Sequence, residues 1–186
     1  MTKIKEFFYN FKNKFNAKCF LLEALLLIVV LSLDLITKHY VVDYLLTQPF
    51  NSAPCIDGFI NLVYVKNYGA SFGIFSGKTE FLIAFVIISL LIMAIIWIFF
   101  LRDQPSVIKI SIIFLIAGGI GNLVDRIAFG YVRDFLNFSF FEFPVFNVAD
   151  SFVVIGTFML IIYLIYSLIV EFKKTKKDKD KEQTNE

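Results

Sequence analysis

Two aspartates, Asp134 and Asp150, could supply a pair of carboxyl groups for general acid–base catalysis. They lie at the two ends of one polar connection between apolar segments, so the chain can bring them together. Two neighbouring carboxyl groups share a proton, because both cannot easily be ionised at once. The charged group can then activate water while the protonated group polarises the scissile carbonyl. Taken singly, Asp134 reads as a solvated partner of Arg133, and Asp150 as a first-turn helix acid.

Other charged residues near the same connection have structural explanations. Asp34 and Lys38 have the spacing of neighbours on one helix face, which favours a pair that anchors a helix end. Asp125 also reads as structural. Arg126 could hold a carboxylate, a substrate carbonyl or a lipid phosphate, and function and structure stay equally open for it. Asn122 lies one helical turn earlier and can point the same way.

Other catalytic chemistries are poorly supplied. His39 is the only histidine, so a histidine-based metal site lacks ligands, and a serine triad would have to combine His39 with Ser71. Cys19 and Cys55 are predicted on opposite membrane faces and read as unpaired thiols. The net charge of +2 is too small to suggest nucleic-acid binding. The sequence therefore predicts no metal and no cofactor.

The elements that must position these residues are membrane-spanning helices. The chain has 186 residues, 58% of them hydrophobic, and the apolar residues gather in long runs. About 20 apolar residues cross a bilayer core as a helix. The sequence predicts an all-α membrane protein with four spans, at 18–40, 81–101, 107–123 and 147–170. We expect a basic segment at 1–17, a four-helix domain at 18–171 and a charged, disordered tail at 172–186.

Lysines crowd both ends of the chain, and such residues flank helices on the cytoplasmic side. Both termini are therefore expected inside, with two outer segments at 41–80 and 125–146. The run 59–65 is β-branched and aromatic and predicts a strand. Aromatic density at 138–146 suits either the membrane interface or packing under the loop. A non-enzymatic carrier with a proton relay is the main alternative, but the spans lack ionisable groups continuing across the bilayer.

Five short blocks together resemble the lipoprotein signal peptidases, the bacterial signal peptidase II family. The blocks are Asp34 with Lys38, Asn67-Tyr-Gly-Ala-Ser-Phe, Gly121-Asn-Leu-Val-Asp-Arg126, Val132-Arg-Asp-Phe135 and Phe146-Asn-Val-Ala-Asp150. The resemblance implies that Asp134 and Asp150 are the catalytic pair. It implies a substrate-binding role for Asn67, Asn122, Arg126 and Asn147, and structural support from Asp34, Lys38 and Asp125.

The resemblance also implies the reaction and its setting. The substrate would be a prolipoprotein that carries diacylglycerol on the cysteine after its signal peptide, cut just before that cysteine. The enzyme would act as a monomer among the lipids of the bacterial cytoplasmic membrane, with its site at the outer face, a small β-structure in the first outer loop and a mobile second outer loop. The basic N-terminal segment and the charged tail are departures from shorter family members.

Overall fold

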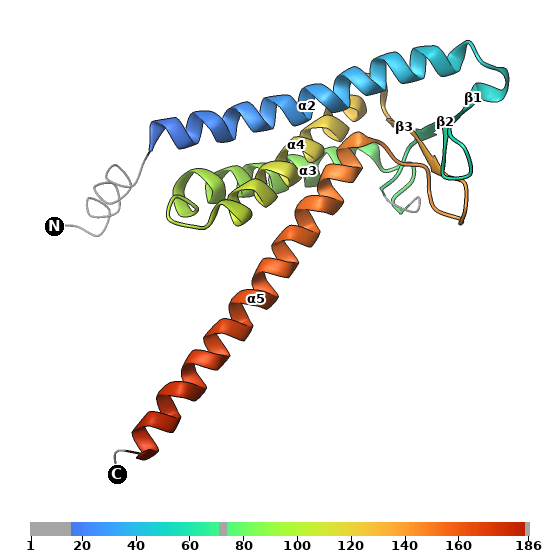
Figure 1. Cartoon of the computed structure of the whole chain (residues 1–186). Coiled ribbons are helices and arrows are strands. Elements are labelled where there is room, and N and C mark those ends of the chain that lie inside the picture. The colour runs from blue at the N-terminus through green and yellow to red at the C-terminus, as the bar shows by residue number, and fades with distance from the viewer. Residues whose placement is uncertain (1–15, 71–73, 185–186) are drawn as a thin grey trace.

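Four long helices with a small sheet at one end make up the structure, a computed structural model that describes residues 16–70 and 74–184 (Figure 1). The helices are α2 (Ala17–Leu46), α3 (Thr79–Ile95), α4 (Ser106–Phe129) and α5 (Val148–Thr184), and a π-helical turn, η3 (Ile96–Phe100), extends α3. All four are long and apolar enough to span a membrane. The four-span prediction is confirmed.

Most apolar side chains of these helices face outward. In the most apolar stretches of α2, α3 and α5, only 11%, 11% and 6% of residues are buried, against 39% in α4. Side chains this apolar and this exposed need lipid around them rather than water. The higher burial of α4 identifies it as the central helix, and it packs against each of the other three.

Glycines let α4 approach its neighbours closely. A Cβ atom on Gly118 would strike the carbonyl oxygen of Ala149, and one on Gly121 would strike the carboxylate of Asp34. Small residues at helix contacts are a common way to bring membrane helices together. These two positions therefore hold the starts of α5 and the Asp34 region of α2 tightly against α4.

A three-stranded antiparallel sheet closes one end of the helices, which we call the sheet end (Figure 1). Its strands are β1 (Ser52–Ile56), β2 (Ile60–Asn67) and β3 (Val132–Phe138), in the order β1-β2-β3, and a short helix, η1 (Pro49–Asn51), leads from α2 into β1. The predicted β-structure in the first outer segment is confirmed. The sequence analysis missed β3, which pairs Asp134 with Val65.

Two helices run further than predicted, and this corrects the setting of several polar residues. Helix α2 continues to Leu46 because no proline or glycine interrupts it before Pro49. Helix α4 continues to Phe129 and ends at Gly130, whose φ of 80° suits glycine. Asp125 and Arg126 therefore lie on a helix rather than in the predicted outer loop.

The structure describes most of the C-terminal tail but little of the N-terminal segment. Residues 1–15 of the predicted basic segment lie outside the described residues. The predicted disordered tail instead continues α5 to Thr184. Its lysine, glutamate and glutamine side chains favour helix, and the tail contains no glycine or proline to stop it.

A second polar cluster lies at the opposite end of the helices, around Glu23 of α2. The Glu23 carboxylate accepts a hydrogen bond from the indole N–H of Trp97 (2.9 Å) and lies 3.1 Å from Arg102 and 3.3 Å from Lys109. Arg102 also lies over the rings of Phe20 and Trp97. This cluster ties α2, η3 and α4 together far from the sheet.

Candidate active site

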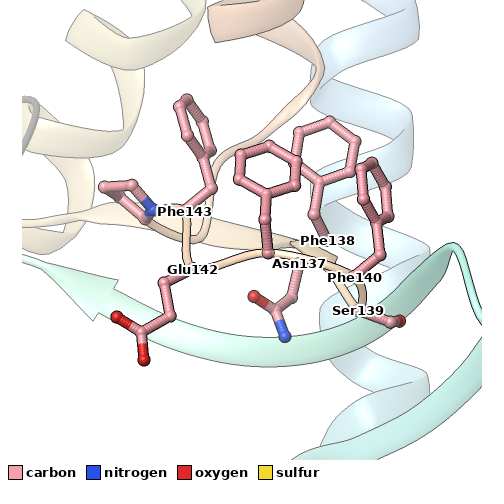
Figure 2. Close-up of a pocket in the computed structure, with 8 residues that line it drawn as sticks. Asn137, Phe138, Ser139, Phe140, Glu142 and Phe143 are labelled. Carbon is pink, nitrogen blue, oxygen red and sulfur yellow. The ribbon is translucent and has the colours of Figure 1, made fainter.

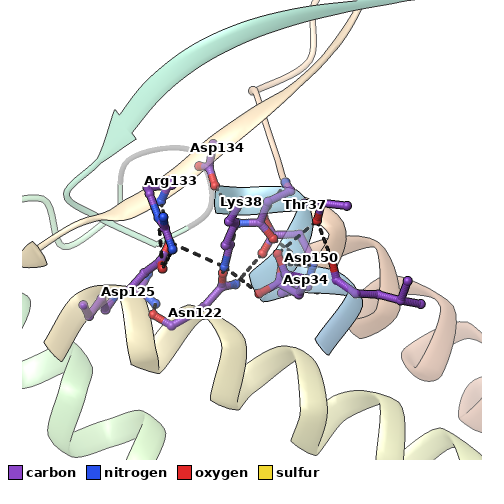
Figure 3. A network of polar contacts seen from close by, with 12 residues as sticks. Asp34, Thr37, Lys38, Asn122, Asp125, Arg133, Asp134 and Asp150 are labelled. Carbon is purple, nitrogen blue, oxygen red and sulfur yellow. Dashed lines mark hydrogen bonds and ion pairs between the residues drawn. The ribbon is translucent and has the colours of Figure 1, made fainter. Parts of the chain in front are cut away.

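Polar side chains from four elements converge at the sheet end of the bundle. Figure 3 shows Asp34 and Lys38 from α2 beside Asn122 and Asp125 from α4, with Asp134 on β3 and Asp150 at the start of α5. Ionisable groups at such depth in a membrane protein are costly and usually functional. The predicted catalytic pair and its predicted supports are thus brought together in one network.

Asp134 is fixed at both carboxylate oxygens. Its side chain is almost fully buried, and it accepts hydrogen bonds from the amide N–H groups of Asn147 (2.7 Å) and Asn67 (2.9 Å). Burial and, next, the charge of Asp150 raise the pKa of Asp134 to about 7, against the opposing effects of the two amides and of Lys38. This carboxyl group can therefore hold a proton near neutral pH. The sequence analysis placed it in a loop, but it lies in a strand.

Asp150 is held by the start of its own helix. Asn147 caps α5 by accepting the backbone N–H of Asp150 (2.9 Å), and Asp150 in return accepts the backbone N–H of Asn147 (3.2 Å). This reciprocal pattern is a capping box. The second carboxylate oxygen of Asp150 accepts the amide N–H of Asn122 (2.7 Å). The predicted first-turn position is confirmed, and the two bonds from Asn147 and Asn122 fix the carboxylate.

Two asparagine side chains connect the two acids. The amide nitrogen of Asn147 donates to the side-chain oxygen of Asn122 (3.0 Å) as well as to Asp134. Asn67 completes the set on Asp134 and also accepts the backbone N–H of Gly69 (2.9 Å). The structure thus places the three asparagines on the carboxyl groups, and the role in substrate binding stays a prediction for each.

Asp34 and Lys38 form the ion pair that the sequence predicts, and it is buried inside the protein. Their charged atoms lie 2.9 Å apart, and both side chains are at most 1% exposed. Asp34 also accepts the backbone N–H of Ala149 (2.8 Å), in the first turn of α5. An acid at a helix N-terminus is stabilised by the free N–H groups there. The pair therefore anchors α5 to α2.

Asp125 pairs with Arg133 rather than with its neighbour Arg126. Two guanidinium nitrogens of Arg133 lie within 3.3 Å of the carboxylate, and the backbone N–H of Arg133 donates to it at 2.9 Å. The solvated Arg133–Asp134 pair considered from the sequence is absent from the described contacts. Arg126 instead donates to the carbonyl oxygen of Gly69 (2.7 Å). The sequence analysis paired Arg133 with the adjacent Asp134. Adjacent residues of a strand point to opposite faces, so Arg133 reaches Asp125 while Asp134 faces the cavity.

Both acids face one cavity of about 590 Å³. Asn67, Arg126 and the two aspartates supply its polar wall, and Phe146, Val153 and Val154 contribute to its apolar wall. Such a volume can hold a short peptide segment with part of an acyl chain. The cavity thus joins a carboxyl pair to an apolar surface on a membrane-spanning helix.

The aromatic segment 138–146 packs on itself beside this cavity. Phe138 contacts the rings of four other phenylalanines of this segment, at positions 140, 141, 143 and 146. Figure 2 shows rings of the segment on one side of the chain, with the carboxylate of Glu142 pointing to the other. Residues 137–144 line a separate pocket, drawn in Figure 2. Phe138 and Phe143 line both that pocket and the cavity of the two acids. The segment therefore forms a wall of the site.

The described residues of the alternative chemistries lie apart from this network. His39 forms an exposed pair with Asp43 at 3.2 Å, and Ser71 lies outside the described residues. Cys19 and Cys55 are both free and exposed. Within residues 16–70 and 74–184, no group of three histidine, cysteine, aspartate or glutamate side chains could hold a metal ion.

The family model described as signal peptidase (SPase) II matches residues 26–166 of this chain. A lipoprotein signal peptidase from Clostridium tetani is 37% identical over 147 residues, which cover 77% of this chain and 92% of the relative. One from Caldanaerobacter subterraneus subsp. tengcongensis is 40% identical over 132 residues, covering 70% and 87%. The residues matched by the family model, 26–166, include all five blocks of the sequence analysis.

Solved structures agree in fold. A bacterial membrane enzyme determined by the in meso method at 2.3 Å resolution superposes with a TM-score of 0.71 and 31% identity, covering 78% of this chain and 88% of that one. A second, at 1.9 Å resolution, gives a TM-score of 0.68 and 33% identity over 76% and 91%. The chain belongs to the lipoprotein signal peptidase family, the bacterial multi-pass membrane enzymes that remove signal peptides from prolipoproteins.

Proposed function

We propose that this chain is an aspartic endopeptidase in which Asp134 and Asp150 form the catalytic pair. One observation carries the proposal. Two carboxyl groups face one cavity, each held by amide N–H groups, and the pKa of Asp134 is raised to about 7. One of the two can then be protonated while the other is charged, which is the condition for acid–base hydrolysis.

The pair divides the work between one protonated and one charged carboxyl group. The protonated group donates a hydrogen bond to the carbonyl oxygen of the scissile bond. The charged group takes a proton from water while the water oxygen bonds to the carbonyl carbon. The C–N bond then breaks, and the leaving nitrogen receives a proton from the pair. Arg126, which lines the cavity, binds a substrate carbonyl or lipid phosphate in this scheme, and Asn67 and Asn122, which also line it, contact the substrate backbone. Asn147 is fully buried outside the lining, so its predicted part in substrate binding is indirect, through the carboxyl group of Asp134.

The substrate is proposed to be a prolipoprotein already carrying diacylglycerol, cut just before the modified cysteine. Support comes from the apolar wall of the cavity, where Val153, Val154 and Ile155 of α5 lie within the membrane-spanning part of the helix. Acyl chains would lie against this wall while the peptide bond reaches the aspartates. A water-soluble peptide without the lipid would leave the wall uncovered and lose its binding energy.

The sheet end is proposed to face the outside of the cytoplasmic membrane. The start of α2 and the end of α5 both point away from the sheet (Figure 1), and the lysine-rich ends of the sequence mark the cytoplasmic side. In this arrangement 18–171 forms the peptidase domain, with 1–17 and 172–186 as cytoplasmic extensions. Both acids come from one chain, so a monomer, as expected from the sequence, supplies the complete catalytic pair.

The test is cleavage of one precursor in two forms, with and without the diacylglyceryl group, by the purified full chain in lipid nanodiscs. Mass spectrometry of both products locates the broken bond. We expect rapid cleavage of the lipidated form before the cysteine, and much slower cleavage of the other. Equal rates for the two forms, or a bond broken elsewhere, would contradict the proposed specificity.

A further inference from the structure

Lys38 is fully buried, and its ammonium group contacts more than an ion-pair partner. It lies 2.9 Å from the Asp34 carboxylate and 3.6 Å from that of Asp125. It also donates to the side-chain oxygen of Asn122, at 2.9 Å. A lysine that only neutralised Asp34 and Asp125 would not need this third contact. Asn122 lies between Lys38 and the proposed catalytic carboxyl groups (Figure 3).

An ammonium group fixes which way an asparagine amide points. Lysine has three N–H donors and no acceptor, whereas an amide has an oxygen acceptor on one side and an NH₂ donor on the other. The end of Asn122 that faces Lys38 must therefore be its oxygen. The NH₂ group of Asn122 is then directed to the other side, where it donates to Asp150 at 2.7 Å.

The same argument extends to the second amide. The oxygen of Asn122 also accepts from Asn147 at 3.0 Å, so the NH₂ group of Asn147 must face it. That NH₂ group lies 2.7 Å from Asp134, while the oxygen of Asn147 accepts the backbone N–H of Asp150. With Asn122 reversed, its oxygen would face the Asp150 carboxylate, and the NH₂ group of Asn147 would lose an acceptor.

We infer that Lys38 is a positioning residue that sets the orientation of both amides, so that Asn122 and Asn147 present N–H donors to Asp150 and Asp134. The inference rests on the proposed function for the role of the two aspartates. It gives Lys38 a part in the reaction that an anchoring ion pair does not have. Lys38 orients the amides through Asn122 and does not itself line the cavity, and its direct charge effect on the pKa of Asp134 is the weakest of those named above.

A double-mutant cycle separates this role from a structural one. Lys38→Met removes all three donors at nearly constant length, and Asn122→Ala removes the amide through which Lys38 acts. We expect Lys38→Met to lower kcat about 10²-fold, as for a misplaced reacting group, with little change in KM. The double variant is expected to be no slower than Asn122→Ala alone, because the two residues act as one unit.

Lys38→Met leaves the buried carboxylate of Asp34 without the cation it contacts, which destabilises the protein. The cycle is therefore repeated in a protein that also carries Asp34→Asn. Asp34→Asn retains the oxygen that accepts the Ala149 N–H, and Asp125 keeps Arg133 as its cation. The same cycle in the Asp34→Asn protein must give the same non-additivity. Arg133→Gln is the matched control, since it also takes a cation from Asp125 but touches neither amide, and its kcat should stay within about twofold of the parent, as for an independent site.

Three outcomes decide the inference. Unchanged kcat in Lys38→Met, or a double variant slower by the product of the two single effects, would overturn it. Asp150→Asn is measured alongside. If that variant keeps normal turnover, the proposed function itself fails; if it is inactive while Lys38 and Asn122 act independently, only the role of Lys38 is refuted.

Discussion

The two ends of the helix bundle each hold a buried polar cluster, and the clusters differ in what surrounds their carboxylates. At the end opposite the sheet, the single carboxylate of Glu23 has two cations, Arg102 and Lys109, within 3.3 Å. At the sheet end, the hydrogen bonds that the described part of the chain donates to the carboxylates of Asp134 and Asp150 come from amide N–H groups. The cations there serve Asp34 and Asp125 instead.

The difference shows how one chain can use carboxylates for two purposes. Cations hold a carboxylate in its charged form, which suits a structural contact between helices. Neutral amides hold a carboxyl group in place while leaving its proton exchangeable. The second arrangement also borders a cavity, whereas the Glu23 cluster packs among aromatic rings. Under the proposed function, the sheet end performs the chemistry and the opposite end stabilises the bundle.

Apart from loss of a catalytic aspartate, the largest fall in kcat is expected from Asn147→Ala at the sheet end. This change removes a donor from Asp134, a donor from Asn122 and the cap of the Asp150 N–H. Loss of one oriented donor in an active site costs about 10²–10³-fold in kcat. Steady-state cleavage of the lipidated precursor measures it.

Asn16→Ala is the matched control, because Asn16 caps the start of α2 at the opposite end. It should cost about 1 kcal/mol of stability, the usual value of a cap, and leave kcat unchanged. A similar loss of kcat from both cap variants would remove the functional distinction between the two ends.

A moderate effect, on stability alone, is expected from Glu23→Gln. The variant keeps an oxygen for the Trp97 indole but leaves Arg102 and Lys109 without a counter-charge. Hydrogen bonds to charged groups contribute about 1.5–3 kcal/mol each. Thermal unfolding of the purified protein should occur at a lower temperature, with kcat per folded molecule unchanged. Glu80→Gln, at an exposed position, is the control.

The smallest expected effect is a change in pH dependence from Asn67→Ala. Asp134 has a pKa of about 7, so it loses the shared proton, and kcat falls, as pH rises through that value. The Asn67 amide stabilises the charged form of Asp134. Its removal raises the pKa further and should move the fall in kcat to higher pH. Asn61→Ala, on the same strand, should leave the profile in place, and a shift to lower pH in Asn67→Ala would contradict the assignment.

Much of this architecture can be predicted from the sequence because hydropathy dictates it. Long apolar runs cannot be satisfied in water, so the four spans follow from composition and length alone. The clustering of Asp34, Lys38, Asp134 and Asp150 at one end follows from which ends of the spans they occupy. The first-turn position of Asp150 follows from the asparagine three residues before it.

The partners within the site could not be predicted in the same way. Whether Asp125 pairs with Arg126 or Arg133 depends on where α4 ends and β3 begins, and helix ends are the least certain part of a sequence-based prediction. Strand β3 was missed because its pairing with β2 joins residues far apart in the chain. The buried contact between Lys38 and Asn122 likewise depends on the close approach that Gly121 allows, which no periodicity reveals.

The central claim is that Asp134 and Asp150 together perform the cleavage. Its most direct test measures single-turnover cleavage of the lipidated precursor by purified Asp134→Asn and Asp150→Asn, beside Asp43→Asn, which changes an exposed aspartate of α2. The account predicts that both site variants remain folded and cleave no precursor, while Asp43→Asn cleaves at the parental rate. Normal turnover by either folded site variant would contradict it.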